Sequence, residues 1–384
     1  VGGGIMAGSR LLTGSGYRLK VPAIDLAEVG AGGGSIIWID PAGALQVGPK
    51  SAGATPGPVC YGKGGTDPTM TDACAILGYL NPNHLVGGDL PLNTELSKKV
   101  FANKIAGPLG LELEQAAYGA YEIASANMIR AIKSVSSERG RDPRDYVLFA
   151  FGGNGPLFAG AMAAILHMRR ILVPPAPGVF SAFGLLCAEV EHHYSQTFRR
   201  VLQSADPAEL ESGWNLLEVQ ADHQLSVDGF SPVQRRLIRS ANMHYQGQIY
   251  ELSVPVPEGP IDQAAVQMLQ DAFGDEHERT YGHRAGPDEP VELVNLELVG
   301  QGLSTVSRVP EGLHAVQNTN QQSTPRQAYF GREHGWMDAP VIAREALSKL
   351  QSGPCIIEEY DATCLVPPGG EASLDDYGNI VIDL

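Results

Sequence analysis

The sequence is poor in the features that mark secreted, membrane and metal-binding proteins. Its 384 residues include five cysteines and no CxxC pair, which fits neither a disulfide framework nor a zinc knuckle. There is no run of about 18 apolar residues, because the longest candidate, residues 159–171, is interrupted by His167, Arg169 and Arg170. The chain does not open with the charged and apolar regions of a secretory signal. These absences favour a cytoplasmic protein without a membrane span.

Positive charge is also scarce. The chain has 27 Lys and Arg against 43 Asp and Glu, a formal net charge of −16, and the acidic residues are scattered along the sequence. This balance favours solubility and argues against a nucleic-acid partner. No HExxH motif is present, and the histidines are spaced too loosely to indicate a zinc site. Ser181 lacks the GxSxG spacing of a hydrolase nucleophile, which favours a turn residue.

Glycine, in contrast, is abundant, with 46 residues, and it is especially dense in two neighbouring stretches, residues 30–34 and 53–65. Glycine loses more conformational freedom on folding than any other residue, so such runs persist where the backbone needs positive φ or close approach to a ligand or another backbone. We therefore expect a binding surface, or a tight seam between domains, near residues 28–72.

The first part of the chain predicts an α/β domain over residues 1–189. Strand formers at 35–40 and 44–47 flank a turn and indicate a hairpin. Residues 69–72 include types that favour a helix N-cap, which predicts a helix over 73–80. A 3.6-residue period of apolar residues predicts a long helix over 112–138. An apolar strand at 146–151, a glycine turn, a helix at 157–167 and a strand at 171–173 then predict a βαβ unit, with the strands buried in a largely parallel sheet.

The later part of the chain has a different pattern. Residues 190–310 combine period-2 stretches with helical patterns near 207–227 and 261–281, which predicts an α+β domain with an antiparallel sheet. Residues 311–330 are rich in Gln, Asn, Ser and Thr and predict a linker. Residues 331–384 predict a small β-rich segment. The length allows two or three domains in all.

Two sets of residues are candidates for chemistry. The turn Gly152, Gly153, Asn154 and Gly155 lies between a strand and a helix, where backbone N–H groups and the helix dipole favour a nucleotide or another anion, although such turns also serve packing alone. It has neither the Lys-Ser/Thr of a Walker A loop nor GxGxxG spacing. Carboxylates near the glycine-rich stretch are weak candidates to hold a metal or position a water, with capping or solvation as the alternative: Asp25, Glu28, Asp40, Asp67 and Asp72.

Several ordered motifs together resemble the hydantoinase A/5-oxoprolinase family. They cover nearly the whole chain and are far more specific together than singly: residues 24–36 (IDLAEVGAGGGSI), 47–54 (VGPKSAGA), 56–62 (PGPVCYG), 68–73 (PTMTDA), 151–156 (FGGNGP), 181–186 (SAFGLL) and 353–358 (GPCIIE).

This resemblance implies the second half of an actin, hexokinase and acetate kinase-like (RNase H-like) ATPase fold, followed by an α+β C-terminal domain. It implies use of ATP, with Mg²⁺ in the full-length protein, to activate a cyclic amide for hydrolysis or a ketone for carboxylation, as 5-oxoprolinases, N-methylhydantoinases and acetone or acetophenone carboxylases do. It also implies a B-type partner subunit and an oligomer. The backbones of Gly152, Gly153, Asn154 and Gly155 would line the adenosine pocket, with Gly32, Gly33 and Gly34 facing the nucleotide cleft.

The sequence departs from the family pattern in one respect. Family members carry two Asp-Gly-Gly-Thr-type phosphate loops upstream of the glycine-rich stretch, and neither is present in these 384 residues. The chain starts at Val1 and reads as the C-terminal portion of a longer protein, so we expect it to be inactive alone, because phosphoryl transfer needs the phosphates and metal held in place. The alternatives are a non-catalytic interaction module of a complex, a ketone carboxylase subunit, and a sugar or acyl kinase with the same fold.

Overall fold

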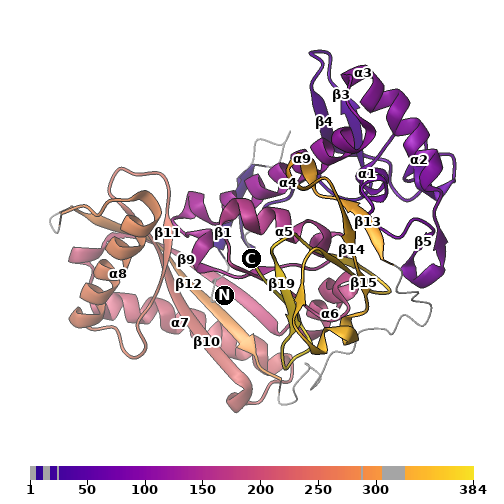
Figure 1. Cartoon of the computed structure of the whole chain (residues 1–384). Helices are drawn as coiled ribbons and strands as arrows, with labels where there is room; N and C mark the ends of the chain where they lie inside the picture. The colour runs from indigo at the N-terminus through magenta and orange to yellow at the C-terminus, as the bar shows by residue number, and fades with distance from the viewer. Residues whose placement is uncertain (1–5, 12–17, 24–25, 287–288, 305–324) are drawn as a thin grey trace. The chain divides into compact units, whose positions relative to one another are not determined.

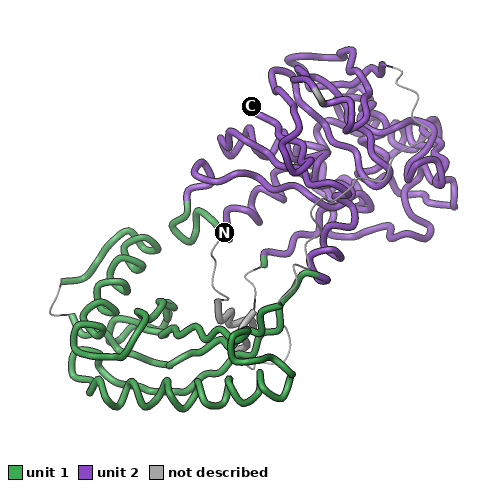
Figure 2. The backbone as a smooth tube through the Cα atoms, turned by 90° about the horizontal axis from the view of Figure 1, so that it is seen from below, with its two compact units in different colours: residues 1–26, 135–141, 187–308 green, residues 27–134, 142–186, 309–384 purple. Residues whose placement is uncertain are grey.

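The computed structural model describes residues 6–11, 18–23, 26–286, 289–304 and 325–384 (Figure 1). The chain separates into two compact units (Figure 2). Unit 1 comprises residues 1–26, 135–141 and 187–308, and unit 2 comprises residues 27–134, 142–186 and 309–384. The predicted boundaries at 190 and 310 lie close to the ends of the long segment of unit 1. Most of the predicted linker, 311–330, lies outside the described residues.

Unit 2 contains a mixed five-stranded sheet in the order β16-β19-β20-β8-β7. The predicted βαβ unit is confirmed: β7 (Leu148–Phe149) and β8 (Arg170–Val173) are parallel and are joined through α5 (Gly155–Leu166). The prediction of a largely parallel sheet is wrong, because the other pairings are antiparallel. They involve three strands from the C-terminal part of the chain: β16 (Gln351–Ser352), β19 (Glu371–Leu374) and β20 (Ile380–Asp383). A short turn joins β19 to β20, which allows these two to form an antiparallel hairpin.

The glycine-rich part of unit 2 forms the expected hairpin of β3 (Ser35–Ile39) and β4 (Leu45–Ser51), followed by α1 (Met70–Ile76). Helix α1 begins three residues before the predicted start, because Thr69 and Asp72 close a capping box around its first turn. The chain continues through β5 (His84–Leu85), β6 (Leu90–Pro91), α2 (Thr94–Phe101), a π-helical turn (Ala102–Ala106) and α3 (Gly107–Leu109).

The long predicted helix is α4 (Leu113–Val135), and its buried stripe is mostly alanine, which lets neighbouring elements approach closely. Tyr121 interrupts that stripe and stacks on Phe158 of α5 with ring centroids 4.8 Å apart. The remaining elements of unit 2 are α6 (Phe180–Cys187), β13 (Arg326–Tyr329), α9 (Gly331–His334), β14 (Trp336–Ala339), β15 (Val341–Ile342), β17 (Cys355–Glu358) and β18 (Thr363–Val366).

Unit 1 is the predicted α+β domain. Its antiparallel sheet runs in the order β11-β10-β12-β9, with β9 (Val190–Val201), β10 (Arg235–Tyr245), β11 (Leu252–Pro255) and β12 (Val291–Gly302). Helices α7 (Pro207–Val227) and α8 (Gln263–Tyr281) pack on it around a core that includes Trp214 and Phe273. The hairpin β1 (Met6–Leu11) and β2 (Arg18–Ala23) also belongs to this unit.

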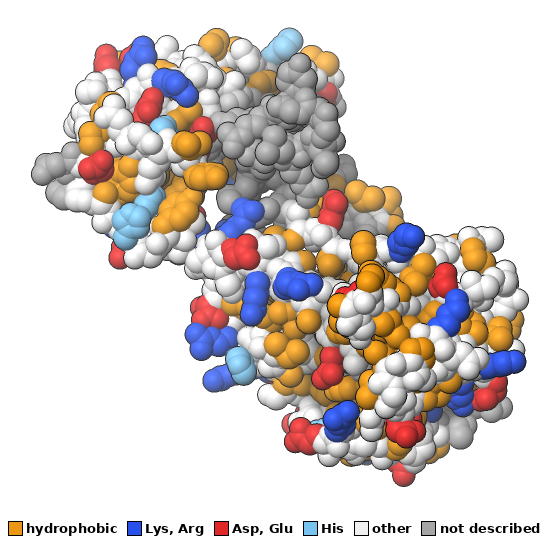
Figure 3. Space-filling model, turned by 90° about the horizontal axis from the view of Figure 1, so that it is seen from above, with side chains coloured by type: hydrophobic (Ala, Val, Ile, Leu, Met, Phe, Trp, Pro, Cys, Tyr) orange, Lys and Arg blue, Asp and Glu red, His pale blue; other side chains and the backbone are white. Residues whose placement is uncertain are grey.

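Two surface properties agree with the sequence. Among the described residues, no helix is long and apolar enough to cross a membrane. Acidic and basic side chains are interspersed over the face drawn in Figure 3, with apolar side chains between them. The described side chains on that face therefore form no continuous basic groove of the kind that follows a nucleic-acid backbone.

Candidate functional site

A cavity of about 550 Å³ lies within unit 2, where three distant parts of the chain meet. A volume of this size suits a small-molecule ligand. Its lining comes from the glycine-rich stretch and the segment after α1, from the turn before α5, and from the segment between β17 and β18: Gly33, Gly34, Ser51, Gly53, Ala54, Pro58, Tyr61, Thr71, Leu80, Asn81, His84, Leu85, Val86, Gly87, Gly153, Asn154, Glu358, Glu359, Tyr360, Asp361, Ala362 and Thr363.

The structure brings the two predicted glycine motifs together in this cavity. Gly33 and Gly34 line it from one side, and Gly153 and Asn154 line it from another. A Cβ added at Gly33 would lie 2.5 Å from Nδ2 of Asn154 and 2.7 Å from Oγ1 of Thr71, so only glycine allows this approach without moving those side chains. The carbonyl of Gly33 accepts hydrogen bonds from the backbone N–H and the hydroxyl of Thr71, at 2.9 and 3.0 Å.

The turn before α5 presents the start of a helix to the cavity. Asn154 is the N-cap residue, and its side chain makes no capping hydrogen bond. Gly152 has φ +83°, a conformation that favours glycine, and its N–H donates to the carbonyl of Pro177 at 2.7 Å. The positive end of the α5 dipole at this turn favours a negatively charged ligand group.

The other predicted glycines lie close by without lining the cavity. Gly32, Gly152 and Gly155 are absent from its lining. The N–H of Gly32 instead donates to the hydroxyl of Ser35 at 2.9 Å, which shapes the turn before β3. Gly155 is the first residue of α5. Nucleotide contact by each of these glycines stays a prediction.

The segment between β17 and β18 contributes the acidic side of the cavity, which the sequence did not predict. Glu358 pairs with Arg326 and accepts a hydrogen bond from Asn81 at 3.4 Å. Asp361 accepts from the N–H of Gly178 at 2.8 Å, and the hydroxyl of Tyr360 donates to Asp89 at 2.9 Å, which raises the pKa of Tyr360. The acidic run at 358–361 directly after an apolar strand was the available signal.

A buried ion pair holds this acidic segment in place. Arg344 donates two hydrogen bonds to Glu359, at 2.6 and 2.7 Å, and three more to the carbonyls of Val173, Pro174 and Gly378. The guanidinium group thus fastens the segment to the end of β8 and to the turn before β20. Burial raises the pKa of Glu359, an effect that Arg344 opposes.

Asp72 occupies a structural position. Its carboxylate is 0% exposed and accepts hydrogen bonds from the N–H groups of Val59, Cys60 and Thr69 and from the hydroxyls of Thr69 and Ser97. These five donors use its acceptor capacity and anchor the glycine-rich loop to α1. It does not line the cavity, so the geometry favours a positioning role over the predicted contact with substrate or metal.

Three other predicted carboxylates, Asp40, Asp67 and Glu28, are not among the residues that line the cavity. Asp40 closes the turn between β3 and β4 by accepting from the N–H groups of Ala42 and Ala44, and the bond from Ala44 is the main reason that the pKa of Asp40 is lowered. Asp67 pairs with Lys104 at 2.8 Å. Glu28 is exposed, and Asp25 lies outside the described residues.

Within the described part of the chain, no group of three or more His, Cys, Asp or Glu side chains could hold a metal ion. The use of Mg²⁺ by the full-length protein therefore stays a prediction, and no ligand is assigned to it among the described residues.

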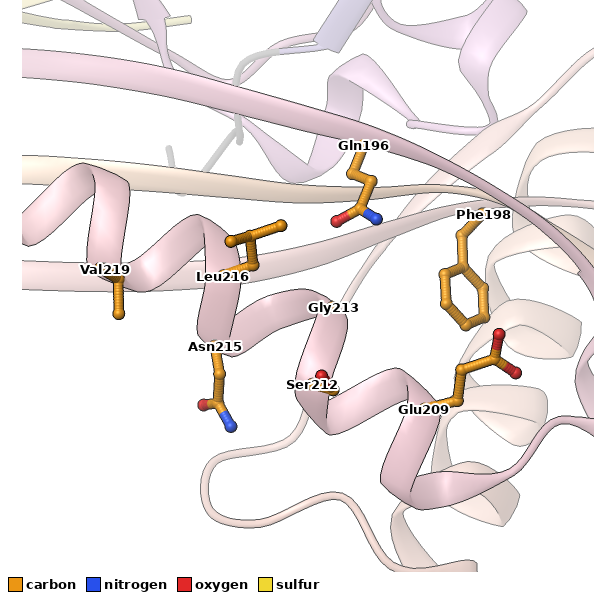
Figure 4. Close-up of a pocket in the computed structure, with 8 residues that line it drawn as sticks. All are labelled: Gln196, Phe198, Glu209, Ser212, Gly213, Asn215, Leu216 and Val219. Carbon is orange, nitrogen blue, oxygen red and sulfur yellow. The ribbon is translucent and has the colours of Figure 1, made fainter.

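A second hollow, of about 560 Å³, lies in unit 1 between α7 and β9 (Figure 4). Gln196 and Phe198 project into it from β9, and α7 forms the other wall. Its one charged lining residue, Glu209, pairs with Arg200 at 3.2 Å. None of the predicted site residues lines it, so the cavity in unit 2 is the stronger candidate.

Comparison with known proteins shows the family to which the chain belongs. Residues 5–194 match the hydantoinase/oxoprolinase family and residues 198–381 match the hydantoinase/oxoprolinase C-terminal domain, so the chain belongs to the hydantoinase/oxoprolinase family. An uncharacterised protein of Methanocaldococcus jannaschii is 38% identical over 100% of this chain and 54% of its own length. The caprolactamase subunit alpha of Pseudomonas jessenii is 36% identical over 94% of this chain and 52% of its own.

Solved structures agree on the fold. The crystal structure of the ATP-dependent caprolactamase from Pseudomonas jessenii has a TM-score of 0.84 and 34% identity, covering 96% of this chain and 54% of that one. Nucleotide-free acetone carboxylase has a TM-score of 0.69 and 28% identity, covering 95% and 53%. The α/β fold of the first part of the chain and the α+β domain that follows are thus confirmed. The chain spans about half the length of these relatives.

Proposed function

We propose that this chain is the part of an ATP-dependent cyclic amide hydrolase that binds the nucleotide, and that it acts with a B-type partner subunit. The observation that carries the proposal is the approach of Gly33 to Asn154 across one cavity, because it joins the two glycine motifs that sequence reasoning assigned to nucleotide contact. Caprolactamase, a lactam-cleaving relative with the higher TM-score of the two neighbours, favours the amide over the ketone as substrate.

In this proposal the chain's own residues bind and orient the nucleotide. The adenosine side would lie against the backbones of Gly33, Gly34 and Gly153, which all line the cavity. The N-terminus of α5 at Asn154 would favour the phosphates. When bound, ATP supplies a phosphoryl group that activates the amide oxygen before hydrolysis.

The carboxylates of Glu358 and Asp361 limit where an anion is accepted in the cavity. Glu358 is the last residue of β17, Asp361 lies between β17 and β18, and the negative charges of these carboxylates would repel triphosphate oxygens. The phosphates would therefore lie toward Asn154, and the acidic wall would face the sugar hydroxyls, which donate hydrogen bonds to carboxylates.

A ketone carboxylase is the second candidate function, favoured by the likeness to acetone carboxylase. A sugar or acyl kinase, and a non-catalytic interaction module, are the remaining alternatives. These functions differ in whether the cavity binds a ligand. The hydrolase, the carboxylase and the kinase require ATP in the cavity, whereas the interaction module requires no ligand there.

The experiment is a substrate-dependent ATPase assay. The chain is expressed within a polypeptide of the relatives' length, together with a B-type subunit, and ADP release is measured with caprolactam, 5-oxoproline, a hydantoin, or acetone plus bicarbonate. ADP release stimulated by a cyclic amide, with ring opening, supports the proposal. Stimulation by the ketone alone would assign the chain to the carboxylases. Absence of ATP binding by both the 384-residue chain and the longer form, measured by calorimetry, would favour the interaction module.

A further inference from the structure

Unit 1 has a long strand at the edge of its antiparallel sheet. Among the described strands, β9 pairs with β12 alone, and residues 190–197 pair with residues 295–302 without a register shift. Edge strands are normally protected from pairing by lysine, proline, a bulge or a covering element. Residues 190–201 contain neither lysine nor proline, and the register shift against β12 lies beyond Thr197. The outer edge of β9 is therefore able to pair with another strand.

The groove beside this edge, between α7 and β9, exposes apolar side chains (Figure 4). Leu216 and Val219 line it from α7 and are 52% and 68% exposed, and Phe198 lines it from β9. Gln196 also lines the groove, and its Oε1 atom is buried with no hydrogen-bond partner among the described residues. Apolar area and an unsatisfied oxygen beside an open strand edge together indicate an interaction surface.

The contacts between β9 and α7 show which part of the helix lies beside the middle of the strand. The hydroxyl of Tyr194 donates to the carbonyl of Gln220 at 3.5 Å, and Arg200 pairs with Glu209 at 3.2 Å. Leu216 lies between these two levels of α7, next to the middle of β9. A two-fold axis through the middle of β9 would therefore bring Leu216 close to the same residue of a second copy.

The side chains of β9 are complementary to those of a second β9 that runs antiparallel to it. A two-fold axis at Ser195 places Glu191 of one copy opposite Arg199 of the other, and symmetry repeats this ion pair. Opposite side chains of antiparallel strands have Cβ atoms about 4.5–5.5 Å apart, close enough for these charges to attract. The same axis places Tyr194 opposite Gln196, so that a rotated Gln196 amide would receive the tyrosine hydroxyl as a donor.

We propose that two copies of this chain associate through β9, antiparallel about a two-fold axis at Ser195. The four-stranded sheets of the two copies would join into one continuous sheet. Leu216 and Val219 would be covered by α7 of the second copy. The occupant follows from the self-complementary order of charges along β9, which an unrelated strand would not match. This inference concerns assembly and does not rest on the proposed function.

The first test measures self-association of the 384-residue chain by sedimentation equilibrium. We expect a dimer, and Leu216→Glu should raise its dissociation constant by about tenfold or more, because each carboxylate would be buried beside its counterpart. Met268→Glu on α8 is the matched control, since Met268 is 56% exposed, and it should dimerise as the unchanged chain does. Thermal unfolding establishes that both variants fold. A chain that stays monomeric, or equal effects of the two substitutions, would overturn the proposal.

The second test exchanges the charges to check the register. Arg199→Glu places like charges opposite each other twice in the dimer and should raise the dissociation constant by about tenfold. The double variant Glu191→Arg with Arg199→Glu restores opposite charges and should recover most of the affinity. Failure of the double variant to recover affinity would overturn the proposed pairing. If the chain is monomeric and the amides of residues 190–197 gain hydrogen-exchange protection only with a B-type subunit, that subunit is the occupant and the proposal is wrong.

Discussion

The guanidinium group of Arg344 forms a bidentate ion pair with the carboxylate of Glu359, and the two side chains are 5% and 4% exposed. Three backbone carbonyls share the same guanidinium group. The acidic wall of the cavity therefore depends on one arginine, located 15 residues before its partner.

Replacement of that arginine should destabilise unit 2 strongly. Arg344→Met leaves the Glu359 carboxylate buried without its partner, and we expect a loss of about 3–5 kcal/mol in the free energy of unfolding. Urea denaturation followed by circular dichroism measures it. The double variant Arg344→Met with Glu359→Gln removes the unpaired charge and should recover part of the loss. Equal losses in the single and double variants would contradict this account.

The Arg344→Met loss should also depend on pH. Burial already raises the pKa of Glu359, and Arg344→Met removes the hydrogen bonds and the positive charge that oppose this rise, so the folded-state pKa of Glu359 would lie further above the unfolded value. The native state then binds the proton more tightly than the unfolded state, which adds stability at low pH that is lost as the pH rises through the folded-state pKa. The deficit relative to the unchanged chain should thus be smaller at pH 5 than at pH 7.

Gly33→Ala tests the nucleotide site without removing a polar group. The new Cβ would meet the ends of the Asn154 and Thr71 side chains, both of which can rotate, so the chain should fold while the Asn154 amide is displaced. We expect ATP affinity in the longer polypeptide to fall by about tenfold, the cost of roughly one hydrogen bond. Gly184→Ala, in α6, is the matched control, because its Cβ meets nothing within 4 Å and the residue does not line the cavity. Calorimetric titration that gives equal affinities for both variants would remove Gly33 from the site.

Features that depend on neighbouring residues could be predicted from the sequence, whereas features that depend on long-range packing could not. The capping box of Thr69 and Asp72 is set within four residues, so the start of α1 was nearly right. The two glycine motifs were recognisable because φ values such as +83° at Gly152 select glycine. Their meeting at Gly33 and Asn154 depends on long-range packing.

The acidic side of the cavity, residues 358–361, could not be predicted from the sequence because it also depends on long-range packing. Glu358 reaches the cavity because β17 pairs with β18 and β15, and its partner Asn81 is 277 residues away. No periodicity in a single sequence encodes such a pairing. The run at 146–151 differs in kind: its composition predicted burial, whereas four of its side chains are each between 42% and 45% exposed, those of Tyr146, Val147, Phe149 and Phe151.

Substitution of Asp72 tests whether its carboxylate has a structural or a catalytic role. Asp72→Asn places an amide N–H₂ group among five buried donors, so we expect the free energy of unfolding to fall by about 2–4 kcal/mol, since an unsatisfied buried polar group costs about 1–3 kcal/mol. Asp40→Asn, in the partly exposed hairpin turn, is the comparison and should cost less. A stable Asp72→Asn protein with abolished turnover would instead assign Asp72 to catalysis.

Gly78 anchors the junction between α1 and β13 and offers the sharpest stability test. Its φ is +77°, and an added Cβ would lie 2.0 Å from the backbone carbonyl oxygen of Gln327, which cannot rotate away. Gly43 has φ +85° with nothing within 4 Å of such a Cβ. Gly43→Ala should therefore cost about 1–2 kcal/mol from backbone strain alone. Gly78→Ala should cost about 2–5 kcal/mol, because a steric clash of about 1–3 kcal/mol adds to that strain. Thermal unfolding of the two variants measures the difference, and equal midpoints would mean that β13 yields at Gln327 without loss of stability.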